Sequence, residues 1–211
     1  MQIKVGTNQD VEIIEEDDGT RTVRITDIPG RRLSTFRPGD IFLMDGHEWI
    51  VLDTHFKTDC GCGYGVGVIS KDFYIIMPFG ISTDFAESNV RQYLDDVVLY
   101  PIRFDIRGEI MPTIAHPYSL DGQNEYMYSS CFIRSLTYDE ARKYNQFLVN
   151  EDLEYGWWTC TPWSTNNRGR NYDMVTIDHS GIISKSNCKR EKCGVRPFCV
   201  LEPNTIALSI T

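Results

Sequence analysis

The sequence predicts an α+β domain with short mixed or antiparallel strands, two helices, long irregular loops and an additional N-terminal β-hairpin. Short β-rich runs bounded by Asp-Gly and Pro-Gly turn signals recur along the chain. Only residues 88–98 and 137–150 show helical periodicity. Apolar residues make up 41% of the chain and aromatic residues 12%, which is enough for a hydrophobic core. We expect a hairpin arm over residues 1–36 and one domain over residues 37–211.

The first 36 residues read as a hairpin. Val11–Ile14 and Thr22–Ile25 are β-rich and flank Asp17-Asp18-Gly19, a turn signal of the Asp-Gly kind. Pro29-Gly30 marks a turn before the rest of the chain. This hairpin is expected either at an edge of the main domain or as an arm used in assembly.

The clearest hairpin joins Ile41–Met44 to Glu48–Asp53. The connecting residues, Asp45 and Gly46, both tolerate the positive φ angles that two-residue hairpin loops require. Further strands are expected at Val66–Ser70, Phe73–Met77 and Cys131–Leu136.

Two segments are expected to be helical. Ser88 caps the first, and its apolar face is predicted to contain Val90, Tyr93, Leu94 and Val97. The second begins at a capping box, in which Thr137 is the cap and Glu140 follows three residues later. It continues through Ala141–Asn150 with an apolar stripe at Ala141, Tyr144 and Leu148.

Residues 155–198 contain two strand signatures on either side of a polar, turn-rich segment. We predict that the strands present this segment as a loop at the surface, and we call residues 155–198 the display region. Residues 166–193 carry a net charge of +3 on a chain whose total is −9. Asn, Tyr and Arg supply adaptable hydrogen bonds and stacking surfaces, as in antibody paratopes. The predicted ligand-binding residues are Trp163, Asn166, Asn167, Arg168, Arg170, Asn171, Tyr172, Asp178, His179 and Asn187. The predicted structural residues are Trp49, Trp157, Trp158, Gly194 and Arg196.

The order of motifs resembles a domain family of gut bacteria and their phages. The motifs are Pro38-Gly39-Asp40, Gly46–Asp53, Val90–Leu94, Gly156–Pro162, Asp178–Gly181 and Gly194–Pro197. That family is similar in turn to the C-type-lectin-like fold of formylglycine-generating enzymes and of retroelement-diversified phage receptor-binding proteins. The resemblance covers roughly residues 38 to 200 and implies a C-type-lectin-like domain with a ligand-facing loop region. Thr159-Cys160-Thr161 and Val195 depart from the residues usual in these proteins.

Resemblance to the formylglycine-generating enzymes implies an alternative function, a copper oxidase that uses Cys188 and Cys193. A loop disulfide or two idle thiols would explain the same pair. Cys60 and Cys62 could complete a zinc site with it, although a one-residue gap is unusual for zinc. Glu202-Pro203-Asn204 matches the calcium-binding tripeptide of C-type lectins, but it follows the terminal strand, so we expect no calcium there. For the leading hypothesis we expect neither a metal nor a cofactor.

The net charge and the N-terminal sequence further limit the classes of function that we expect. A net charge of −9 argues against nucleic-acid binding. No signal peptide or membrane-spanning run is visible, so synthesis in the cytoplasm without membrane insertion is expected. We expect a non-enzymatic recognition module of a phage virion, in its capsid decoration, fibre or tail. It would form a homo-oligomer or a larger assembly and bind a protein or glycan on a cell surface. A purely architectural virion subunit that contacts only neighbouring subunits is the third possibility.

Overall fold

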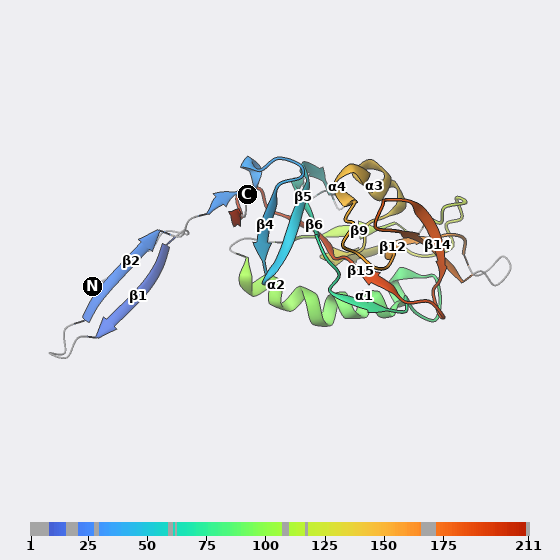
Figure 1. Ribbon diagram of the computed structural model, residues 1–211, viewed down its shortest axis with the longest axis horizontal. Coiled ribbons are helices and arrows are strands. Elements are labelled where there is room, and N and C mark those ends of the chain that lie inside the picture. The colour runs from blue at the N-terminus through green and yellow to red at the C-terminus, as the bar shows by residue number, and fades with distance from the viewer. Residues whose placement is uncertain are drawn as a thin grey trace.

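The computed structural model describes residues 9–15, 21–27, 30–58, 61, 63–106, 110–116, 118–165 and 172–209. Strands β1 (Gln9–Glu15) and β2 (Arg21–Asp27) pair antiparallel, as the Asp-Gly signal predicts. Figure 1 shows this hairpin standing apart from the body formed by the rest of the described chain. None of the described helices is long and apolar enough to cross a membrane.

The larger sheet of the body has the strand order β11-β16-β6-β5-β4-β17-β3, and β8 also pairs with β16. Its strands are β3 (Arg31–Arg32), β4 (Ile41–Met44), β5 (His47–Lys57), β6 (Tyr64–Ser70), β8 (Ile110–Met111), β11 (Ile133–Arg134), β16 (Phe198–Leu201) and β17 (Ile206–Ser209). The first and last strands of the body, β3 and β17, are neighbours at one edge, and a short 3₁₀ turn, η1 (Leu33–Thr35), follows β3 in the chain.

The turn between β4 and β5 confirms the hairpin expected there. Asp45 has φ 53° and Gly46 has φ 70°, and positive φ at both central residues is the mark of a type I′ turn. Asp45 is the one residue other than glycine with positive φ in the described ranges. The local right-handed twist of such turns matches that of the flanking strands, so two residues suffice to set the register.

A second sheet has the order β14-β13-β12-β15-β7. Its strands are β7 (Ile75–Met77), β12 (Trp157–Pro162), β13 (Asp173–Ile177), β14 (Ile183–Asn187) and β15 (Cys193–Val195). The two strand signatures that bracket residues 155–198 lie next to each other, because β12 and β15 pair parallel with Trp157 opposite Gly194. A separate pair joins β9 (Thr113–Ala115) to β10 (Ser129–Cys131).

The first helical region is longer than predicted, and its apolar face differs. After a 3₁₀ turn, η2 (Phe85–Glu87), the helix runs through α1 (Asn89–Tyr93), a π turn labelled η3 (Leu94–Val98) and α2 (Leu99–Asp105). Ser88 caps it as expected, its hydroxyl accepting from the Arg91 N–H. The predicted placement of Val97 on the buried face is wrong, since Val97 is 52% exposed and Val98 is buried. The i→i+5 turn reduces the rotation per residue, so the core-facing positions are Val90, Leu94, Val98 and Ile102.

The second helical region follows the prediction closely. Both bonds of the capping box at Thr137 and Glu140 are present at the start of α3 (Tyr138–Lys143). The helix is interrupted at Tyr144, which has φ −103° and ψ 11°, and continues as α4 (Asn145–Leu148). The expected stripe of Ala141, Tyr144 and Leu148 is buried.

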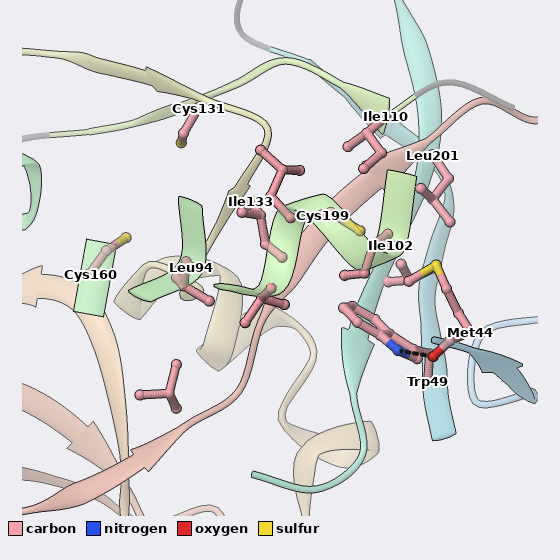
Figure 2. Packing of buried hydrophobic residues seen from close by; sticks show 14 of the residues in the cluster. Met44, Trp49, Leu94, Ile102, Ile110, Cys131, Ile133, Cys160, Cys199 and Leu201 are labelled. Atoms are coloured by element: carbon pink, nitrogen blue, oxygen red, sulfur yellow. Dashed lines mark hydrogen bonds between the residues drawn. The ribbon is translucent and has the colours of Figure 1, made fainter. Parts of the chain in front are cut away.

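The larger sheet is buried on both faces, and residues alternate between two hydrophobic clusters. Trp49 and Val51 of β5 belong to the cluster covered by the helix over residues 89–105, while Ile50 and Leu52 belong to the cluster covered by α3 and α4. Figure 1 shows the helices on opposite sides of the sheet. In Figure 2, the Trp49 ring lies among Met44, Ile102 and Leu201, and its Nε1 donates to the Met44 carbonyl at 3.2 Å.

Trp157 and Trp158 are adjacent in sequence but enter different clusters. Trp158 packs in the cluster beneath the long helix and Trp157 in the cluster beneath α3 and α4. This follows from the alternation of side chains along a strand. Short strands in two larger sheets and two two-stranded pairs, together with two helical regions, confirm the predicted mixed α+β class.

Candidate recognition face

The end of β12 fixes Trp163 at the start of the predicted display region. The Trp163 N–H donates to the Asp173 carbonyl at 2.9 Å, which continues the pairing of β12 with β13. Lys185 of β14 donates to the Asp173 carboxylate at 2.8 Å and lies with its Nζ 5.4 Å from the centroid of the Trp163 ring. The half-buried ring is thus held between the sheet and a cation.

Tyr172 lies where the chain re-enters the sheet and has a similar environment. Its carbonyl accepts from the Cys188 N–H at 2.7 Å, and the Lys189 Nζ lies 3.6 Å from its ring centroid. The Asn187 side-chain oxygen accepts from the backbone N–H groups of Lys189 and Arg190, both at 3.2 Å. Asn187 therefore shapes the turn that sets Lys189 over Tyr172, and the structure places these predicted residues together.

A loop that the sequence analysis did not select holds the same end of β12. The Leu120 N–H donates to the Pro162 carbonyl at 2.8 Å, and the Gln123 side chain donates to the Ser164 hydroxyl at 3.0 Å. Thr165 donates to the Glu125 carboxylate at 2.6 Å. Ser164 and Thr165 are both buried. These contacts fix the residues from which the chain enters the 166–171 segment.

The region containing this face matches a known family. Residues 80–203, more than half of the chain, match the family described as Domain of unknown function (DUF6273). The chain belongs to the DUF6273 family. No curated protein and no solved structure shows significant similarity to it. The DUF6273 match includes both strands that bracket the display region and the loop that braces it.

Five of the ten predicted ligand-binding residues of the DUF6273 domain lie outside the described residues. These are Asn166, Asn167, Arg168, Arg170 and Asn171. The described part of the predicted face therefore consists of Trp163, Tyr172 and the turn at Asn187.

Asp178 and His179 do not share this face. They lie at the opposite end of β13, a five-residue strand that spans about 16 Å. The Asp178 carboxylate accepts from the Ser180 N–H and the Ile182 N–H, both at 2.9 Å, and from the Ser180 hydroxyl at 2.7 Å. Burial acts to raise the pKa of Asp178, but these hydrogen bonds outweigh it and lower the pKa. Asp178 shapes the β13–β14 turn, and the ten predicted residues do not converge on one surface.

The residues predicted to be structural are all buried: Trp157, Trp158, Gly194 and Arg196 lie within the DUF6273 match, and Trp49 lies before it. Arg196 donates to the carbonyls of Ser70 at 3.0 Å and Leu148 at 2.9 Å, and its guanidinium lies 5.2 Å from the Trp157 ring centroid. Burial lowers the pKa of Arg196 to about 10. Arg196 links the larger sheet to the end of α4.

The cysteine pair considered for catalysis consists of two buried, unpaired thiols. Burial raises the pKa of both Cys188 and Cys193 to about 11. Reactive cysteines instead have lowered pKa values. Cys60 and Cys62 lie outside the described residues, and the ranges that are described contain no group of three or more His, Cys, Asp or Glu able to hold a metal ion.

The Glu202-Pro203-Asn204 tripeptide lies in the turn between β16 and β17. The Pro203 carbonyl accepts from the Ser34 N–H at 2.9 Å, and the Thr205 N–H donates to the Glu202 carbonyl at 3.0 Å. These bonds tie the tripeptide to η1 beside β3, at the edge of the larger sheet.

Proposed function

We propose that this DUF6273 protein is a non-enzymatic recognition module with a C-type-lectin-like frame, whose binding face consists of Trp163, Tyr172 and the 166–171 segment between them. The proposal rests on how firmly Trp163 and Tyr172, which we call the platform, are held on either side of this segment. Both ends of the segment are held by backbone bonds within the second sheet, and Ser164 and Thr165 are also tied to the loop at Gln123 and Glu125. Rigid support lowers the entropic cost of binding through a displayed loop.

The chemistry of the platform also suits recognition. Two aromatic rings, Trp163 and Tyr172, each lie beside a lysine, and the surrounding residues 166–193 carry a net positive charge. Aromatic rings next to cations supply apolar contact area and charge complementarity in one place. The ligand is a protein or glycan exposed on a cell surface.

The arrangement of the whole chain supports a role in an assembled particle. The β1–β2 hairpin and β14, which carries Lys185, lie at opposite ends of the molecule in Figure 1. An isolated two-stranded hairpin is marginally stable in water and gains stability by packing on another surface. The hairpin would contact neighbouring subunits of a phage virion, as part of a capsid decoration, fibre or tail, while the other end faces outward.

A glycan and protein array tests the binding face. Trp163→Ala, Arg168→Ala and Tyr172→Ala are expected to lose the signal that the unaltered protein gives. His179→Ala serves as the matched control, because His179 is exposed at the far end of β13. Unchanged binding in all three variants would overturn the assignment of the face.

A purely architectural subunit is the second candidate, and the hairpin that stands apart from the body favours it. Light scattering on a sizing column compares the full chain with a chain that lacks residues 1–36. Either role in a particle predicts an oligomer that is lost when the hairpin is removed. A purely architectural role predicts, in addition, that the protein gives no signal on the array.

The copper oxidase hypothesis is tested by copper titration with a thiol assay at Cys188 and Cys193. Absence of copper uptake would overturn it.

A further inference from the structure

A cleft of about 390 Å³ lies beside the recognition face. One wall contains His116, Tyr118, Ser119 and Leu120, the other is the first turn of α3, and Thr161 of β12 also lines the cleft. Its volume is within the range of small-molecule sites. None of the ten ligand-binding residues predicted from the sequence lines it.

One wall of the cleft carries packed aromatic rings. The rings of His116 and Tyr118 are stacked, with centroids 6.4 Å apart, and Tyr128 meets both edge-on. The Tyr118 and Tyr128 hydroxyls are 3.0 Å apart, yet Tyr118 remains 45% exposed. On the facing wall, half-buried Tyr138 supplies another ring. The Arg142 Cζ lies 5.4 Å from the Tyr138 ring centroid, and His116 stacks on Tyr118, so each wall offers the other face of its ring to a ligand.

The charges at the cleft are already balanced. The Glu140 carboxylate is bound by Arg134 through two hydrogen bonds of 2.6 and 2.7 Å. The Asp139 carboxylate is paired with Arg142 at 3.2 Å. Because each carboxylate that lines the cleft has its own arginine, neither an anionic nor a cationic ligand would gain a net attraction there.

Hydroxyl groups complete the lining, and they are fixed in place. Thr161 accepts from the Tyr138 N–H at 2.9 Å, and Thr137 accepts from the Glu140 N–H at 3.2 Å. Ser119 accepts from the Gln123 N–H at 2.9 Å. Each hydroxyl has a second lone pair, so it can accept a further hydrogen bond from a ligand. Preorganised polar groups of this kind favour a ligand with several hydroxyls of its own.

We propose that the cleft binds a neutral saccharide of one or two rings, stacked on Tyr118 and Tyr138. The weakly positive C–H face of a sugar ring is attracted to the negative face of an aromatic ring. The hydroxyls around the sugar ring then meet Thr137, Thr161 and Ser119. This proposal rests on the proposed recognition function and gives the chemical class of one ligand, at a site separate from Trp163 and Tyr172.

Saturation-transfer NMR and calorimetry on the full chain test the proposal. The neutral probes are maltose, lactose, cellobiose and N,N′-diacetylchitobiose, and the charged comparisons are glucuronic acid and glucosamine. At least one neutral disaccharide is expected to bind more tightly than both charged sugars. Tyr118→Ala and Tyr138→Ala are expected to raise its Kd by about ten-fold or more. Tyr118→Phe keeps the ring and is expected to bind nearly as well as the unaltered chain.

Trp163→Ala separates this proposal from the proposed function. It is expected to bind the disaccharide normally, because Trp163 does not line the cleft, but to lose the array signal of the recognition face. If Trp163→Ala loses the array signal while the unaltered protein binds no neutral sugar at millimolar concentration, the cleft proposal alone is overturned. Disaccharide binding that survives both alanine variants would also overturn it. Thermal unfolding of each variant shows whether it is folded.

Discussion

Arg134 and Glu140 form a bidentate ion pair at the base of α3. The Arg134 guanidinium donates to the two Glu140 carboxylate oxygens at 2.6 and 2.7 Å, and one of those oxygens also accepts from the Thr137 N–H at 2.8 Å. Arg134 also lies over the Phe198 ring, with its Cζ 4.7 Å from the centroid. One carboxylate thus completes the helix cap and neutralises a buried cation of β11.

Removing that carboxylate should destabilise the protein strongly. Glu140→Ala leaves Arg134 buried without its counter-charge, which costs about 3–5 kcal/mol in comparable buried pairs. Asp139→Ala is the matched control: its ion pair with Arg142 is exposed and contributes about 0–1 kcal/mol. Urea unfolding measures both. A loss below about 1 kcal/mol for Glu140→Ala would show that the pair is not a main anchor of α3.

The same pair predicts a dependence of stability on pH. Burial acts to raise the pKa of Glu140, but attraction and hydrogen bonds from Arg134 and Thr137 outweigh it and lower the pKa below the usual 4.5. Because the pKa is lower in the folded state, the stabilisation is complete above about pH 4.5 and is lost as the pH falls through the folded pKa. Urea midpoints between pH 7 and pH 3 should fall less steeply for Glu140→Gln than for the unaltered chain. Parallel curves would contradict this.

Gly194→Ala tests the parallel pairing of β15 with β12. A Cβ at Gly194 would fall inside the space of the Phe73 ring, so the ring or the strand must move. Overpacking of this kind typically costs about 1–3 kcal/mol. Phe73→Ala in the same chain should recover part of the loss, since it removes the obstructing ring. If Gly194→Ala unfolds at the same urea concentration as the unaltered protein, β15 lies further from Phe73 than described.

The π turn predicts opposite outcomes for two neighbouring valines. Val98 is buried beneath the larger sheet, so Val98→Ala should cost about 2 kcal/mol through lost burial and a small cavity. Val97 is 52% exposed, and Val97→Ala should change the stability by less than about 0.5 kcal/mol. Thermal or urea unfolding compares the two. The reverse order would indicate a regular α-helix through residues 94–98.

The buried thiols should be slow to react. Burial raises the pKa of Cys188 and Cys193 to about 11 and that of Cys160 to about 12, so few thiolates are present at pH 8. Iodoacetamide labelling followed by peptide mass mapping should find these three residues unmodified in the native protein and modified in urea. Rapid labelling of Cys188 and Cys193 in the native protein would favour the copper oxidase hypothesis.

Local signals in the sequence were enough to predict several elements. Asp45-Gly46 confines the backbone to the turn that β4 and β5 require, and the capping box at Thr137 begins a helix through bonds only three residues apart. The face of the long helix could not be read in the same way. The sequence around Val97 shows no signal for a π turn, and the burial of Val98 depends on packing against a distant sheet.

The candidate site was predictable only in part for a similar reason. Trp163 and Tyr172 flank one short segment, so their closeness in the sequence was enough to predict that they belong to the same site. Asp178 was grouped with them because it follows closely in sequence, whereas a full strand separates them in space. The loop at Gln123 and Glu125 was missed, since its contact with Thr165 joins residues about forty positions apart. The closely spaced tyrosines Tyr118, Tyr126 and Tyr128 were a signal that could have indicated the wall of the cleft that contains Tyr118.

The pairing of β3 with β17 has a mechanical consequence. Arg31 lies opposite Ala207, so the chain enters and leaves the body at the same end of one short antiparallel ladder. Leu208 and Ser209 hold β17 to β4, so tension applied through residues before Arg31 would peel β3 from β17 one bond at a time, which needs less force than shearing the ladder. The load would be relieved at that edge, and the sheet that carries Trp163 and Tyr172 would keep its shape while the molecule is pulled.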